Sequence, residues 1–429
     1  MAMARPIAAG QEGGSDGFRS LSGADRLAWL LVALAPAIFA IASWSRTGER
    51  NSVQALLLSF SLPITAIEMV VILFAARAGF QPSQAVARLP AWALIALVLL
   101  VAVAAGTAAL VAPNGATAIL RTIAWAIHLL FGFSAWYLLG TRWAPLRRAV
   151  WPWIAAGVAL YVLVLAALVL AIPDEAAFNW KFLGLGVTHV RQVGFYSVVG
   201  AAAALGLAAV ERSWPRYWLA VAAASLFLAL SYWSGTRGSL FAILAAFGAG
   251  FVLLPAMRTI RAAAALVVGN AAGALIALVH VPPHPFYGVL RISRTAASAS
   301  ADAITTGRIA QWTASARAVL ERPFFGHGES QYGFAVPAYA EFNHPHNILL
   351  QVALQWGLVG FACFFSLAAL LGWRFVAAAR GGGAGQAPAF LVAVGLATMA
   401  LYEGSLYHPY PVMMFALALA FVLAAPARA

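Results

Sequence analysis

The stretch EFNHPHNILLQVALQWGLVGFACFFSLAALLG, residues 341–372, decides the fold class. It opens with a polar segment that carries His344 and His346, and from residue 347 onward it is almost entirely apolar. An apolar run of 18 or more residues is long enough to cross the hydrocarbon core of a bilayer as a helix. The sequence therefore predicts a transmembrane helix over 347–372, with a histidine pair where the chain enters the membrane.

The rest of the chain follows the same pattern. Of its 429 residues, 63% are hydrophobic and only 9% are charged, and the mean hydropathy is +0.87, whereas soluble domains carry about 25% charged residues. The apolar runs are continuous rather than alternating, which favours helices. We predict an all-α polytopic membrane protein of about 12 transmembrane helices, at 27–44, 55–76, 91–112, 120–140, 151–171, 193–210, 216–233, 239–256, 263–281, 347–372, 388–403 and 411–425.

This pattern divides the chain into four parts. A tail, 1–26, precedes nine spans within 27–281; a long loop, 282–345, precedes the last three spans and a short tail, 346–429. The loop is expected to be partly helical, because GRIAQWTASARAVL (307–320) is amphipathic. One face of that helix would carry Ile309, Trp312, Ala316 and Val319 or Leu320, and the other Arg308, Gln311 and Ser315.

Basic residues set the expected topology. If the N-terminal tail is cytoplasmic, the cytoplasmic segments hold 15 arginines, and the short opposite loops hold only Arg46, Arg50, Lys181, Arg191 and Arg237. This bias obeys the positive-inside rule, which ignores long loops. We therefore expect both termini in the cytoplasm and the long loop on the outer side, which in a Gram-negative cell means the periplasm and a protein in the inner membrane. Scattered between apolar runs, the arginines give little support to nucleic-acid binding.

Four outward segments carry residues suited to chemistry. They are THVRQVGFYS (188–197) with Arg191, SGTRGSLF (234–241) with Arg237, TTGRIAQW (305–312) with Arg308, and the histidine segment. Guanidinium groups match the oxygens of phosphate and pyrophosphate, so a lipid-linked pyrophosphate is a natural ligand on this side. Taken singly, each arginine could instead contact lipid headgroups, and each histidine could cap a helix.

Two other uses of these residues stay open. His344 and His346 could ligate a metal from an extended chain, with Glu341 or Glu329 as a third ligand. Glu68 and His128, both inside expected spans, would suit a 12-span transporter, because charged residues in a membrane can mark ion pathways. We find no internal repeat of the kind that many transporters show.

The motifs SGTRGSL, TGRIAQW, FGHGESQYG and HPHNILLQVALQWGLVG, in this order, resemble the O-antigen ligase family. That family lies within the superfamily of lipid-linked polysaccharide ligases and polymerases, and the resemblance covers about 188–372. It implies a glycosyltransferase of GT-C-like fold that uses no nucleotide sugar. Such a ligase transfers polysaccharide (O-antigen) from undecaprenyl pyrophosphate to a lipid A–core sugar, completing lipopolysaccharide. An O-antigen polymerase or a protein O-oligosaccharyltransferase would use the same donor.

The resemblance also assigns roles to residues. It makes His346 the general base, since Asn347 follows it directly, and leaves His344 as a supporting residue or the alternative base. Arg237 and Arg308 would be catalytic, and with Arg191 they would bind the pyrophosphate. The transfer would invert the anomeric carbon and need neither metal nor cofactor. The expected partners are the lipid-linked donor, the lipid A–core acceptor and membrane lipids, with no nucleic acid.

Overall fold

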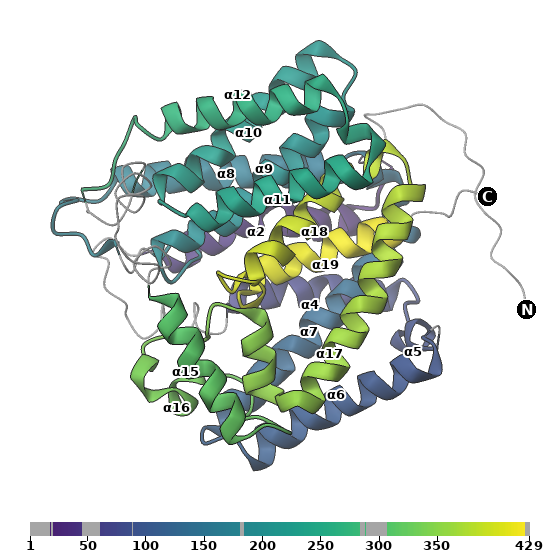
Figure 1. The fold of residues 1–429 in the computed structure, drawn as a ribbon. Coiled ribbons are helices and arrows are strands. Elements are labelled where there is room, and N and C mark those ends of the chain that lie inside the picture. Colours follow the sequence, from purple (N-terminus) through teal and green to yellow (C-terminus); the bar gives the residue numbers. More distant parts are fainter. Residues whose placement is uncertain are drawn as a thin grey trace, which may run out of the picture.

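The computed structural model of the chain describes residues 18, 20–44, 61–87, 89–180, 184–283, 288 and 307–424. Over these residues the secondary structure is helical, and the helices form a bundle with a smaller helical part at one end (Figure 1). The expected all-α architecture is confirmed. Several residues of the topology argument, Arg46, Arg50 and Lys181, lie outside the described residues, as do most of the tail 1–26, the start of the span at 55–76 and much of the loop 282–345.

Each of the twelve predicted spans overlaps a helix. These helices are α2 (Gly23–Ser43), α4 (Leu62–Arg77), α6 (Ala91–Leu110), α7 (Gly115–Gly140), α8 (Val150–Leu170), α9 (Val193–Val210), α10 (Trp214–Trp233), α11 (Arg237–Leu253), α12 (Ile260–Ile276), α17 (Ile348–Gly381), α18 (Ala387–Ala400) and α19 (Pro409–Leu423). Among the described helices, six are long and apolar enough to cross a membrane: α2, α6, α7, α8, α9 with its preceding turn, and α17. The protein is therefore membrane-integral, while the count of twelve spans stays a prediction.

The helices run alternately up and down, so the bundle has two distinct ends. At one end the start of α2 meets the end of α7, where Arg142 lies 3.7 Å from Asp25. At the same end Arg147 donates a hydrogen bond to the carbonyl of Phe421 near the end of α19. We call the opposite end, which carries residues 188–192, 234–237, 307–347 and 401–408, the loop end. The start of α2 and the end of α19 thus lie at the same end, away from the loop end.

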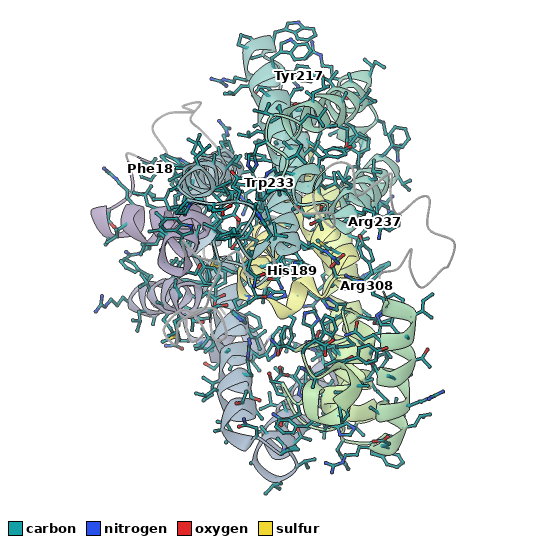
Figure 2. All side chains as sticks on the ribbon, turned by 90° about the vertical axis from the view of Figure 1, so that its left-hand side faces the viewer. Phe18, His189, Tyr217, Trp233, Arg237 and Arg308 are labelled. Carbon is teal, nitrogen blue, oxygen red and sulfur yellow. The ribbon has the colours of Figure 1, made fainter. Side chains whose placement is uncertain are left out.

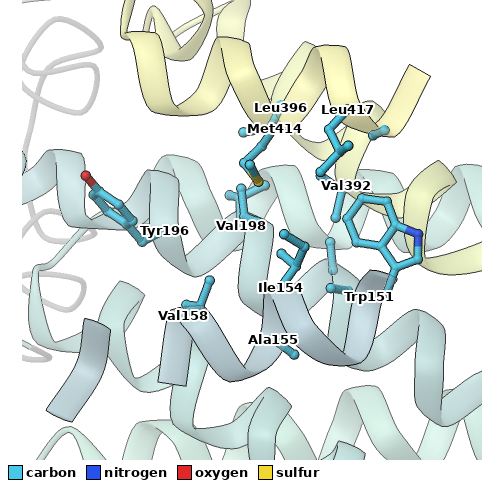
Figure 3. Close-up of a cluster of buried hydrophobic side chains, with 14 of the residues drawn as sticks. Trp151, Ile154, Ala155, Val158, Tyr196, Val198, Val392, Leu396, Met414 and Leu417 are labelled. Carbon is cyan, nitrogen blue, oxygen red and sulfur yellow. The ribbon is translucent and has the colours of Figure 1, made fainter. Parts of the chain in front are cut away.

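Helix α9 lies at the centre of the bundle, against α8, α10, α11, α12 and α18. Its sequence is rich in Gly and Ala, which lets neighbours approach closely; a Cβ on Gly200 would lie 2.6 Å from the Phe227 ring. Figure 3 shows the apolar core beside it, where Ile154 of α8, Val198 of α9 and Leu417 of α19 are buried together. This tightly packed core fixes the helix ends that carry the loop end.

The long helix α17 is interrupted, which the sequence did not predict. Gly357 has non-helical dihedrals (φ 63°, ψ −170°) between a short helix and a longer one. The segment before α17 pairs with this break: His327 N–H donates to the carbonyl of Leu354, and Leu358 N–H donates to that of Pro323. A Cβ at Gly357 would lie 2.3 Å from the backbone of Phe324. The apolar run that was expected to form one span therefore begins as a separate short helix.

This short helix packs on the loop-end helices α15 (Arg308–Glu321) and α16 (Tyr332–Ala335). The predicted amphipathic helix at 307–320 is confirmed as α15. Its polar side chains Gln311 and Ser315 are buried, whereas Ile309 is 43% and Leu320 76% exposed. Gln311 donates to the carbonyl of His344, so the interior of the loop end is built from polar contacts.

Candidate functional site

The loop end brings together all four motif segments and adds a fifth, residues 401–408. In the view onto this end, His189, Arg237 and Arg308 lie near the middle of the molecule, where the bundle helices meet the part that carries α15 (Figure 2). The motifs are far apart in sequence, so their meeting is a product of the fold.

The turn that carries Arg237 is held by buried hydroxyl groups. Gly235 adopts φ 65°, a left-handed conformation that glycine takes without strain. The Thr236 hydroxyl donates to the backbone carbonyl of Arg191 at 2.6 Å. This bond links the first two motif segments, so Arg191 and Arg237 leave the backbone from adjoining points.

The Arg191 segment is a short turn, η3 (Val190–Gln192), fixed at both ends. The ring Nδ1 of His189 accepts a hydrogen bond from the Arg191 N–H at 3.1 Å, so His189 is a cap. The Gln192 amide nitrogen lies 3.2 Å from His408 Nε2, which ties this turn to the start of α19.

Arg308 forms a half-buried ion pair that the sequence did not reveal. Its Nη2 donates to Glu403 Oε2 at 2.7 Å, and the two side chains are 13% and 17% exposed. The buried Nη1 of Arg308 finds no hydrogen-bond partner among the described residues. Burial raises the pKa of Glu403, but the charge of Arg308 and its hydrogen bond to the carboxylate help to outweigh this, and the pKa lies below its ordinary value. Glu403 is therefore an anion within a cationic site, beside one guanidinium arm that can still donate.

The two histidines occupy one tight turn. His346 has φ 55°, uncommon for a residue with a side chain, and its N–H donates to His344 Nδ1 at 3.1 Å. Its ring Nδ1 lies 3.4 Å from the carbonyl oxygen of Glu403. Since a carbonyl only accepts, Nδ1 carries the proton and Nε2 keeps a free lone pair. Backbone strain of this kind is concentrated at functional sites.

Burial sets the protonation state of this pair. Burial, followed by the charge of Arg308, lowers the pKa of His346 to about 4, although Glu403 acts in the opposite direction. Burial, followed by the neighbouring His346, lowers the pKa of His344 well below its ordinary value. Both rings are therefore neutral at pH 7. Asn347 does what a cap does: its Oδ1 accepts from the N–H groups of Leu349 and Leu350 at the start of α17.

The metal hypothesis gains no support from the part of the chain that the structure describes, where no three His, Cys, Asp or Glu side chains are placed so that they could hold a metal ion. Glu329, one suggested third ligand, is fully buried and accepts a hydrogen bond from Gln355. Burial, only partly offset by Arg121, raises the pKa of Glu329 to about 7.

Several residues around the histidines escaped the sequence analysis. The guanidinium of Arg121 lies over the Tyr407 ring at 5.2 Å, and that ring is 4.7 Å from the ring of His344. Arg121 lies inside the predicted span 120–140, so nothing in the sequence placed it near the outer motif segments. Glu403 and Tyr407 follow another span in EGSLYHPY (403–410), where the acid and the His-Pro pair were the available signals.

The buried acid inside the membrane bundle proves to be paired. Both carboxylate oxygens of Glu68 lie 2.7–2.8 Å from His128 Nδ1, and Glu68 is 0% exposed. The two residues that a transporter would use therefore satisfy each other within the bundle.

Comparison with known proteins agrees with the motifs. Residues 222–365, from α10 into α17, match the family model described as O-antigen ligase. The match contains Arg237, Arg308, His344, His346 and Asn347, and excludes Arg191 and Glu403. No curated protein matches the chain significantly. The resemblance predicted from the motifs is thus confirmed over residues 222–365, where the chain is similar to the O-antigen ligase family.

Proposed function

We propose that this protein is an O-antigen ligase, which transfers polysaccharide from undecaprenyl pyrophosphate to a sugar of lipid A–core. The family domain supports a function among the lipid-linked polysaccharide ligases and polymerases. The main support for transfer from a pyrophosphate donor is the guanidinium of Arg308. Its buried Nη1 has no hydrogen-bond partner among the described residues, and it lies near the neutral His346.

In this reaction the acceptor hydroxyl oxygen bonds to the anomeric carbon of the donor sugar. The bond from that carbon to the pyrophosphate oxygen breaks, and its electron pair leaves with the pyrophosphate. Attack from the opposite face inverts the anomeric carbon. Arg308, Arg237 and Arg191 stabilise the charge that grows on the leaving pyrophosphate, because preorganised donors act strongly in a buried site.

His346 takes the proton of the acceptor hydroxyl on Nε2. The hydrogen bond from Nδ1 to the Glu403 carbonyl orients the ring and fixes the tautomer that leaves Nε2 free. The sequence suggested an imidazole that titrates near neutrality, whereas in the structure burial and then Arg308 lower the pKa of His346 to about 4. A bound pyrophosphate would offset the charge of Arg308 and raise this pKa toward the working pH.

The lipid chain of the donor has a suitable place in the bundle. A cavity of about 470 Å³ lies among α7, α17 and α19, lined mainly by apolar side chains such as Leu129, Phe133 and Leu370. We propose that it accepts part of the polyprenyl chain. On this proposal the protein lies in the bacterial inner membrane, with the loop end in the periplasm and both termini in the cytoplasm.

The test uses purified protein in nanodiscs with undecaprenyl-pyrophosphate-linked glycan and lipid A–core, with and without EDTA. The expected product is a lipid A–core that migrates more slowly on a gel, formed equally with EDTA and lost in His346→Ala and Arg308→Ala. Arg317→Ala is the matched control, because Arg317 lies exposed on the same helix as Arg308. Glycan lengthening on the polyprenyl carrier would indicate a polymerase instead, and the absence of either product would reject both activities.

A further inference from the structure

We infer that Glu403, which lies outside the matched family domain, is a positioning residue that holds the general base and the pyrophosphate-binding arginines in one fixed arrangement. The inference rests on the proposed function and extends it to a residue that the motifs do not contain. Three contacts made by Glu403 and its neighbour Tyr402 support it.

The first two contacts come from opposite ends of the same residue. The carboxylate of Glu403 binds Arg308 Nη2 at 2.7 Å, and its backbone carbonyl lies 3.4 Å from His346 Nδ1. A displacement of Glu403 would therefore move the arginine and the histidine together. Glu403 therefore helps to set the distance between the leaving group and the base, and misplacement by about 1 Å can cost a reaction 10²-fold in rate.

The third contact reaches the arginine turn. Tyr402 donates from its hydroxyl to the carbonyl of Gly238 at 2.8 Å. A Cβ on Gly238 would lie 2.7 Å from Glu403 Cγ, so a glycine after Arg237 lets Glu403 lie directly against this turn. Residues 402 and 403 thus contact the segments of all three family motifs that carry Arg237, Arg308 and His346.

Glu403 is better suited to positioning than to proton transfer. The same oxygen that meets Arg308 is held at ion-pair distance, and a carboxylate whose pKa lies below its ordinary value is a weak base. The pairing also orients Arg308: with Nη2 held by Glu403, the fixed plane of the guanidinium aims Nη1. Glu403 itself is anchored at the end of α18, where its N–H donates to the carbonyl of Met399.

The decisive experiment compares wild type with Glu403→Gln, which keeps the shape and removes the charge. Inorganic pyrophosphate binding is measured by calorimetry, and glycan transfer by single turnover. We expect transfer to slow 10- to 100-fold while pyrophosphate binds as tightly as in wild type or tighter, because a competing anion is gone. Glu321→Gln, an exposed acid at the end of α15, should change neither. Unchanged transfer, or weakening of pyrophosphate binding in proportion to the loss of transfer, would overturn the inference.

A second readout needs no transfer activity and so separates this inference from the proposed function. In ¹⁵N-histidine-labelled protein, wild-type His346 should be protonated on Nδ1 and free on Nε2. In Glu403→Gln its titration midpoint should move to lower pH, because Arg308 and Arg191 still face the ring and the opposing carboxylate is lost. The opposite tautomer, or an unmoved midpoint, would reject the role of Glu403 even if the ligase reaction were established.

Discussion

Two acids in this molecule, the buried Glu68 and the half-buried Glu403, differ in what surrounds their partners. Inside the bundle, both carboxylate oxygens of Glu68 lie within hydrogen-bond distance of His128 Nδ1. Glu403 meets Arg308 through one oxygen at the loop end, and Arg308 keeps a buried Nη1 without a partner among the described residues. Arg237, Arg191 and His346 lie in the same electrostatic environment as Glu403.

A charged side chain inside a protein does not by itself indicate a functional site. A pair whose members satisfy each other stabilises packing and resists a second ligand. A pair that leaves a donor uncommitted, next to further cations and a base, is arranged to receive an anion.

The largest expected effect is the loss of Arg308. Arg308→Ala should lower the transfer rate about 10³-fold, because it removes a preorganised donor from the leaving pyrophosphate. Arg308→Lys should recover only part of the rate, since an ammonium lacks the planar fork. Single-turnover transfer measures both, with Arg317→Ala as the control. Activity near wild type in Arg308→Ala would mean that this pair is as closed as that of Glu68.

A tenfold or greater loss is expected from Gly404→Ala. The new Cβ would lie 2.3 Å from the His344 ring. Gly404 also has φ 67°, a backbone conformation that is strained for a residue with a side chain. Movement of His344 would disturb the turn that holds His346. Gly385→Ala, where a Cβ meets nothing within 4 Å, is the matched control. Equal transfer rates in the two variants would show that the histidine turn tolerates displacement.

The transfer rate should fall only at unusually low pH. His346 acts as a neutral base, so kcat/KM should stay nearly flat from pH 8 to 6 and fall about tenfold per unit only below its pKa of about 4. The folded-state pKa lies below the ordinary value of 6.5, so the unfolded chain binds more protons between these values. The contribution of His346 to stability is therefore lost as the pH falls from about 6.5 toward 4. A rate midpoint near 6.5 in free enzyme would contradict this.

The smallest effect on activity should come from the closed pair. Glu68→Gln should change transfer less than threefold but lower the Tm, because a neutral amide is a weaker hydrogen-bond acceptor for the buried His128 than a carboxyl group that meets it through both oxygens. Thermal unfolding in detergent and the gel assay measure the two properties separately. Abolished transfer in a folded Glu68→Gln protein would return the transporter hypothesis to consideration.

Much of this architecture could be predicted from periodicity. Apolar runs and motif order were enough to place twelve helices and to select Arg237, Arg308 and His346, because hydrophobic length and short motifs are local properties. Glu403 and Arg121 were not singled out, since their significance comes from Arg308 and Tyr407, which are 95 and 286 residues away in sequence. The break at Gly357 was missed for the same reason: the backbone of Pro323 and His327 supplies the hydrogen bonds that make it tolerable.

The distribution of the site over the chain limits how such a protein can be reshaped. Arg191 precedes the matched stretch 222–365 and Glu403 follows it, yet Thr236 contacts the backbone of the first and Arg308 the carboxylate of the second. The stretch that defines the family is therefore not a transplantable module. A chimera that exchanges only this stretch with a distant relative would join two incompatible halves of one site, whereas exchanging 188–408 as a block would keep the contacts among Arg191, Thr236, Arg308, His346 and Glu403 within one parent.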